Sequence, residues 1–292
     1  KAGGAPTADN SGGQTPTSGS RMDGGSVSTT NYSNTVTSGA TIKYPIRMST
    51  ASHGGLSIFT YNGGSGPSCI PHGLSTSLPG GGRPEMFWIN NVSGDAGGGT
   101  ISRPVFHRGM HATTPWLRWL VLHTNEATGD LGAAGDWAWD SVQPGTTTLT
   151  LGTGGAFNDA GDVSCIVALA RVPGLIGIGH YIGNGAADGT NVVIDDGSVG
   201  FKPAWLMVKN FDRSGSQWLI YDNKRSNVYN PSGNLVQADA TDTEATVGGY
   251  PLDFTANGFK VMGTNLTTNR VNDRILYLAF AEEPFGLNNR AK

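Results

Sequence analysis

The chain has 292 residues with a formal net charge of −3, and 14 % of its residues are charged. This near-neutral balance lacks the clustered Lys and Arg of a nucleic-acid-binding surface, and no apolar run approaches the roughly 18 residues of a membrane-spanning helix. Glycine occurs 45 times, about twice the average frequency of about 7 %. Short apolar runs separated by Gly, Thr, Ser and Asn predict an all-β fold, and the length fits one large domain or two of ordinary size.

Residues 1–55 are predicted to form a Gly/Ser/Thr-rich extended arm followed by a lead-in strand. Over 1–35, Met22, Val27 and Tyr32 are nearly the only large apolar side chains. This stretch therefore cannot supply a core of its own. We expect it to become ordered only by lying along another surface.

An internal repeat follows the arm. Residues 149–173 align without gaps on 260–284 at a constant offset of 111, and "GGRPEMFWINN" (81–91) resembles "GFKPAWLMVKN" (200–210). Sparse identities that recur in the same order predict two tandem homologous antiparallel β-sandwich domains, over 56–175 and 176–292. The matched pairs include Tyr61 with Tyr181, Pro84 with Pro203, Gly152 with Gly263, and Asn158 with Asn269.

The two predicted domains differ most after "GGRPEMFWINN". Trp119 follows Asn91 after 28 positions, whereas the matching Trp218 follows Asn210 after 8, which predicts a 20-residue insertion in the first domain. The insertion contains Pro and Gly and no helical pattern, so a metal site on two histidines four positions apart is disfavoured. We expect a contact surface for a partner there, formed by Arg103, His107, Arg108 and His111.

Two segments give the clearest strand predictions. In "AWLMV" (204–208) the apolar side chains point to both faces, which predicts a central strand whose second face is covered by a partner subunit or an extra layer. Lys209 and Asn210 mark its expected return to water. In "LDFTANGFKVMG" (252–263), Asn257-Gly258 separates two alternating runs and is expected to supply the positive φ angles of a tight hairpin turn.

A pair of tryptophans is the best candidate for a ligand site. Trp137 and Trp139 in "GDWAWDS" are predicted to share one face of a strand, next to Asp136 and Asp140. An exposed face of this kind suits stacking on a sugar or packing on a neighbouring subunit. Plain packing in the core is the alternative, and the pattern favours it.

The sequence offers no catalytic constellation. It has no Gly-x-Ser-x-Gly elbow and no glycine-rich loop that ends in Gly-Lys-Ser/Thr. Cys69 and Cys165 lack the spacing of a zinc or redox site and are expected to be small core residues. We therefore expect a non-enzymatic protein without metal or cofactor. Carboxylates that glycan hydrolysis would require are present, but nothing in the sequence pairs them; they are Asp136, Asp140, Asp222, Asp253, Glu282 and Glu283.

The order "GFKPAWLMVKN…WLIYDNKR…NGFKVMGTN…LYLAFAEEPF" resembles a β domain of tailed-bacteriophage structural proteins, notably of marine and cyanobacterial phages, where it occurs in tail-fibre-like or head-associated proteins. The resemblance is good over about 180–292 and weaker over 56–175. There, "LHTNE" and "ALAR" replace the Tyr-Asp-x-x-Arg and Ala-Phe-Ala-Glu of the pattern. The matching elements are Tyr181, Gly183-Asn184-Gly185, Gly200-Phe201, Pro203, Trp205, Tyr221-Asp222, Arg225, Asn257-Gly258-Phe259 and 279–285.

The resemblance implies a jelly-roll or lectin-like sandwich and a place in the virion, assembled in the host cytoplasm. It favours a fibre, spike or capsid decoration component that contacts other capsid or tail proteins and itself, as a homo-oligomer such as a trimer. One alternative is a module of a tail fibre that binds a host glycan or receptor. Another is a glycan depolymerase, which needs paired carboxylates in a groove. Neither nucleic acid nor a membrane is an expected partner.

Overall fold

The computed structural model describes residues 54–64, 67–92, 102–130, 137–225, 230–232, 234–241, 244–246 and 249–284, together with the backbone of 42–48. Over these residues the chain is nearly all-β, and every strand pairing is antiparallel, as predicted. The helical segments in this part of the chain are single turns: η1 (Pro79–Gly82), η2 (Arg108–Met110), η3 (Pro115–Leu117) and α1 (Gly155–Asn158).

The first half of the chain forms a large sheet and a small one. The large sheet has the order β1-β2-β9-β4-β5-β6-β7, and the small one pairs β3 with β8. The lead-in strand predicted before residue 56 is β1, which pairs with β2 along the sheet edge. The bounds are β1 Ile42–Met48, β2 Leu56–Asn62, β3 Ser68–Pro71, β4 Met86–Asn91, β5 Pro104–His107, β6 Arg118–Val121, β7 Gly129–Asp130, β8 Thr148–Leu151 and β9 Val163–Leu169.

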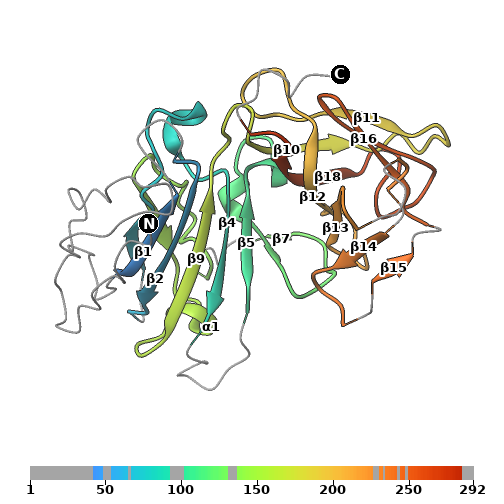
Figure 1. The fold of residues 1–292 in the computed structure, drawn as a ribbon. Coiled ribbons are helices and arrows are strands. Elements are labelled where there is room, and N and C mark those ends of the chain that lie inside the picture. The colour runs from blue at the N-terminus through green and yellow to red at the C-terminus, as the bar shows by residue number, and fades with distance from the viewer. Residues whose placement is uncertain are drawn as a thin grey trace.

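The second half has a similar plan (Figure 1). Its large sheet has the order β10-β18-β12-β13-β14-β15, and its small sheet the order β11-β17-β16. The bounds are β10 Ile176–Ile182, β11 Thr190–Val193, β12 Pro203–Asn210, β13 Leu219–Asp222, β14 Asn234–Gln237, β15 Ala245–Thr246, β16 Leu252–Thr255, β17 Gly258–Val261 and β18 Arg274–Ala281. The order β2-β9-β4-β5-β6 thus parallels β10-β18-β12-β13-β14.

Matched residues of the two halves make the same hydrogen bonds. The Tyr61 hydroxyl donates to the Phe157 carbonyl over 2.6 Å, and the Tyr181 hydroxyl donates to the Thr268 carbonyl over 2.7 Å. Phe157 and Thr268 are 111 positions apart, which is the offset of the repeat. A buried tyrosine therefore ties β2 to the segment before β9 and β10 to the segment before β18, which supports the predicted repeat.

The paired asparagines give a second equivalence. Asn158 donates from Nδ2 to the Gly152 carbonyl, and Asn269 donates from Nδ2 to the Gly263 carbonyl, both over 2.7 Å. Both asparagines are buried. Because a buried amide without partners is costly, each asparagine holds its own loop closed in the same way.

The sheets correct the place of the predicted insertion. Phe87 on β4 pairs with Phe106 on β5, just as Leu206 on β12 pairs with Tyr221 on β13. Strand β5, which lies inside the supposed insertion, therefore takes the position of β13. The run that contains Trp119 forms β6, one strand further out, in the position of β14. Trp119-Leu120-Val121 and Trp218-Leu219-Ile220 resemble each other because both are short apolar runs. They do not occupy equivalent strands, so aligning them produced the supposed insertion.

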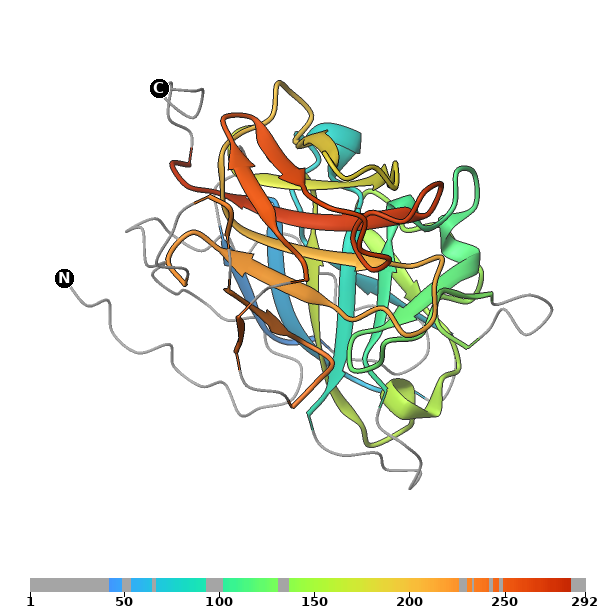
Figure 2. The same ribbon diagram turned by 90° about the vertical axis from the view of Figure 1, so that its right-hand side faces the viewer.

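The large sheet of the second half is buried on both faces, as its sequence predicts. Leu206 and Val208 pack in a core that includes Phe259 of the small sheet. Met207 and Leu278 belong to a second core that they share with the first half of the chain. The covering layer is thus the first half of the same chain, and Figure 2 shows the strands of the second half running across those of the first.

Two details of the strand predictions are wrong. Lys209 and Asn210 are buried where water was expected, since Lys209 donates to the Ser216 carbonyl and Asn210 donates from Nδ2 to the Leu266 carbonyl and the Asp273 carboxylate. The hairpin of β16 and β17 is confirmed, but its pairing Thr255↔Gly258 leaves 256–257 as the turn, and neither Asn257 nor Gly258 has a positive φ. Gly258 serves a close approach instead, since a Cβ there would lie 1.9 Å from the Val192 carbonyl oxygen.

Candidate functional site

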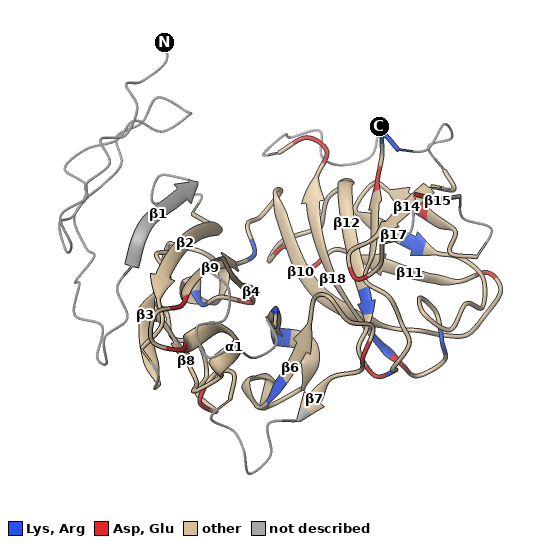
Figure 3. Cartoon of the chain, turned by 90° about the horizontal axis from the view of Figure 1, so that it is seen from below, with Lys and Arg blue, Asp and Glu red and all other residues tan. Residues whose placement is uncertain are grey.

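A cluster of four ion-paired side chains lies where the two halves meet. Glu85 precedes β4, and Arg171 follows β9; the Arg171 Nε lies 2.8 Å from a Glu85 carboxylate oxygen. The Arg171 backbone N–H donates to the same oxygen over 3.1 Å. Arg108 and Arg171 of the first half both pair with Asp195 of the second. Figure 3 shows acidic and basic segments in this central region.

The cluster is electrically balanced. Arg108 also donates from Nε and Nη2 to the Ile178 carbonyl of β10, over 3.2 and 2.8 Å. Burial alone would raise the pKa of Asp195, but the charges of Arg108 and Arg171 outweigh it, so the pKa of Asp195 is lowered. The carboxylate of Asp195 therefore stays ionised at neutral pH, and its ion pairs with Arg108 and Arg171 hold the halves together.

His107 departs from the prediction of a partner contact. Its side chain is fully buried; Nδ1 accepts from the Gly109 N–H over 2.9 Å, and Nε2 lies 3.4 Å from the Tyr277 carbonyl oxygen in the second half. Since Nδ1 accepts, Nε2 carries the proton. Burial, with the nearby charge of Arg108, lowers the pKa of His107 to about 3, so the ring is neutral. The contact that this histidine makes is within the chain.

The other three residues of the predicted contact surface differ in their surroundings. Arg108 is occupied by the ion-paired cluster described above. The Nδ1 of His111 accepts from the backbone and hydroxyl groups of Thr113 and Thr114, which fixes a local turn. Arg103 is exposed. A partner contact at Arg103 or His111 stays a prediction.

The predicted tryptophan face is not formed. Residues 137–141 make bends and a turn, and Asp140 has a φ of 53°. Trp139 is 1 % exposed and donates from Nε1 to the Arg118 carbonyl, whereas Trp137 is half-buried. Core packing, the alternative interpretation, holds for Trp139, and Asp136 lies outside the described residues.

Other candidate groups also have structural partners. Asp222 pairs with Arg225 at 2.9 Å, and Glu282 pairs with Lys202 at 2.7 Å. Both cysteines are unpaired, partly buried thiols. Over the described residues, no three His, Cys, Asp or Glu side chains are grouped so that they could hold a metal ion, and no helix is long and apolar enough to cross a membrane.

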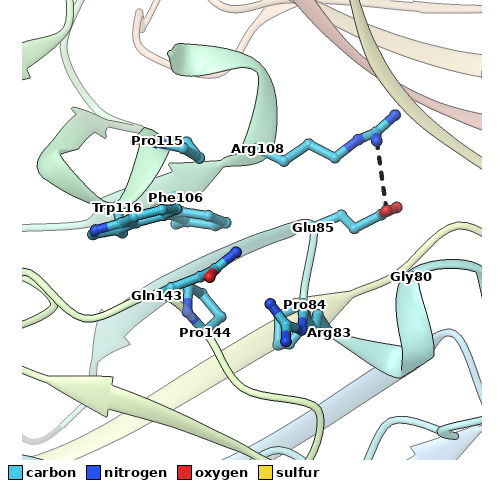
Figure 4. Close-up of a pocket in the computed structure, with 10 residues that line it drawn as sticks. All are labelled: Gly80, Arg83, Pro84, Glu85, Phe106, Arg108, Pro115, Trp116, Gln143 and Pro144. Atoms are coloured by element: carbon cyan, nitrogen blue, oxygen red, sulfur yellow. Dashed lines mark ion pairs between the residues drawn. The ribbon is translucent and has the colours of Figure 1, made fainter. Parts of the chain in front are cut away.

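Two hollows adjoin the ion-paired cluster, and Arg108 lines both. The larger, of about 380 Å³, is also lined by His111, His180, Asp195 and Tyr277. Burial and the charges of Arg108 and Arg274 lower the pKa of His180 against the opposing effect of nearby acids. The smaller, of about 150 Å³, lies within the first half and is lined by residues from 80–85, from 106–108, from η3 and from 143–144 (Figure 4). Sequence reasoning missed it because its lining comes from four separate segments.

A buried lysine lies near the same boundary. Lys209 is fully buried and donates from Nζ to the Ser216 carbonyl. Burial lowers its pKa to about 8, although Asp239 and Glu126 act in the opposite direction. The folded state therefore binds this proton less tightly than the unfolded state, in which the pKa of lysine is about 10.4.

This lysine makes stability depend on pH in a definite direction. Below pH 8 the penalty for charging Lys209 is fully present, and it disappears as the pH rises toward about 10.4, where the unfolded lysine also loses its proton. Relative to Lys209→Met, the wild type should gain about 3 kcal/mol of unfolding free energy across that range. Urea denaturation of both proteins between pH 7 and 10 measures the difference. The buried tyrosines titrate equally in both proteins, so parallel curves would contradict this assignment.

Comparison with known proteins gives one match. A model of a protein family described as a domain of unknown function (DUF7483) matches residues 8–284. The comparisons with curated proteins and with solved structures each found no match.

Proposed function

The chain belongs to the DUF7483 family, and we propose that it is a non-enzymatic structural component of a tailed-phage virion: a fibre, a spike or a capsid decoration protein. The shared core carries this proposal. Met207, Leu278 and Trp218 of the second half are buried in one cluster with side chains of the first, so the two halves support each other as a single body. A protein that bears load in an assembly needs this kind of rigidity.

Two further features support the same function. The four-residue ion cluster fixes the halves by charge-assisted hydrogen bonds, which are stronger than neutral ones. The resemblance of residues 180–292 to a β domain of phage structural proteins supports a place in the virion. In this proposal residues 1–41 bind a neighbouring virion protein or another copy of the chain.

Purified particles of the phage that encodes the chain test the proposal. We expect the protein in washed particles at a fixed ratio to the major capsid protein, with cross-links from residues 1–41 to a capsid or tail protein. Its absence from washed particles would refute a virion role. Cleavage of host polysaccharide by the purified protein, abolished by Asp222→Asn or Glu282→Gln, would establish a depolymerase instead.

A further inference from the structure

The smaller hollow beside the ion-paired cluster has a net positive charge. Within the part of the chain that the structure describes, Arg83 is exposed and has no carboxylate partner, whereas Glu85 is taken by Arg171. The Nε and Nη2 of Arg108 donate hydrogen bonds to Ile178 and Asp195 of the second half. Because the cluster of Glu85, Arg108, Arg171 and Asp195 is balanced, Arg83 is the charge that remains for a ligand.

The internal repeat explains why Arg83 is unpaired. Arg83 precedes Pro84 as Lys202 precedes Pro203, so the two cations are equivalent. In the second half Lys202 pairs with Glu282 at 2.7 Å. The position equivalent to Glu282, at the offset of 111, is Arg171. The first half thus has the base Arg171 where the second half has the acid Glu282. Arg83 is left without that partner and lines the hollow.

The rest of the lining is suited to a ring with polar substituents. Trp116 and Pro115 form one wall, Phe106 lies at the base, and Gln143 stands opposite with an exposed amide (Figure 4). An aromatic ring packs well on the C–H face of a sugar, and an amide can both donate to and accept from hydroxyl groups. The volume of about 150 Å³ is small beside the roughly 300–1,000 Å³ of pockets for drug-sized ligands. One ring is therefore the expected occupant.

We propose that this hollow binds a sugar residue that carries a carboxylate, such as a uronic acid at the end of a glycan. Arg83 binds the carboxylate through paired N–H donors, since the planar guanidinium group matches a planar carboxylate. Trp116 packs against the ring, and Gln143 binds its hydroxyl groups. The site differs from the predicted Trp137–Trp139 face, and it does not depend on where the chain lies in a particle.

Titration of the full-length protein with D-glucuronate, followed by ligand saturation-transfer NMR and protein chemical shifts, tests the proposal. We expect a dissociation constant on the order of a millimolar, as suits a small ligand in a small site. Neutral glucose should bind about tenfold more weakly. Arg83→Ala should weaken glucuronate binding by about tenfold or more, whereas Lys202→Ala, the matched change in the second half, should leave it unaltered.

Four results would overturn the proposal. Equal binding of glucose would show that the carboxylate is not recognised, and equal binding of sulfate would show an unspecific anion contact. Stronger binding of benzoate than of glucuronate would point to aromatic acids instead of sugars. Full binding by Arg83→Ala would place the ligand elsewhere. Because Arg83 is exposed and unpaired, the variant should keep the thermal stability of the wild type, which makes loss of binding interpretable.

Discussion

Glu85→Ala is expected to lower the free energy of unfolding by about 3–5 kcal/mol, the usual cost of removing one partner from a buried ion pair. The Glu85 side chain is 8 % exposed, and its carboxylate accepts from both the backbone and the side chain of Arg171. Without it, Arg171 keeps a buried charge that Asp195 only partly compensates, since Asp195 is 44 % exposed. Urea denaturation at pH 7 measures the change.

Two variants define what the Glu85 result means. Glu85→Gln keeps the shape and loses the charge, so it should be intermediate between wild type and Glu85→Ala. Glu283→Ala removes an exposed carboxylate of the second half and should change stability by less than about 0.5 kcal/mol. A cost for Glu85→Ala no larger than that of Glu283→Ala would show that the cluster does not stabilise the fold.

Trp218→Ala is expected to cost about 3–5 kcal/mol, the range for removal of a large aromatic side chain from a core. Trp218 is fully buried in the core that both halves share, and its indole Nε1–H donates to the Val121 carbonyl of the first half over 3.0 Å. Loss of this side chain should weaken the contact between the halves as well as the core. Guanidinium denaturation should therefore show a lower midpoint and, in this variant, a separation of the two halves into distinct steps.

Trp218→Phe separates packing from hydrogen bonding. It keeps most of the apolar volume but removes the indole donor from the Val121 carbonyl, which then keeps only the longer bond of 3.4 Å from the Thr124 N–H; the loss should cost about 1–3 kcal/mol. If Trp218→Ala unfolds at the wild-type midpoint, Trp218 does not stabilise the contact between the halves.

Much of the fold was predictable because its signals are local. The alternation of apolar residues and the turn residues indicates antiparallel strands, and the offset of 111 places Asn158 and Asn269 in loops that they close in the same way. The two-sided apolar pattern of β12 correctly predicts a covered sheet. Its cover was not predictable, because a partner subunit and the first half of the same chain would bury the same side chains.

The site was less predictable, since it depends on contacts far apart in sequence. Lys209 at a strand end looks solvated in the sequence but is fully buried in the structure. Arg83, Trp116 and Gln143 line the same hollow only because three segments far apart in the sequence converge there. One available signal was overlooked: in the aligned repeat, Arg171 stands where the second half has Glu282. Because a base stands there in place of the acid that pairs with Lys202, the equivalent cation Arg83 lacks that partner and is free to bind a ligand.

Scanning calorimetry of the full-length wild type tests most directly whether the two halves form one body. A shared core predicts a single transition in which the calorimetric and van't Hoff enthalpies agree. Two resolved transitions, or a calorimetric enthalpy about twice the van't Hoff value, would show that the halves unfold independently and would contradict the rigid scaffold on which the proposed function depends.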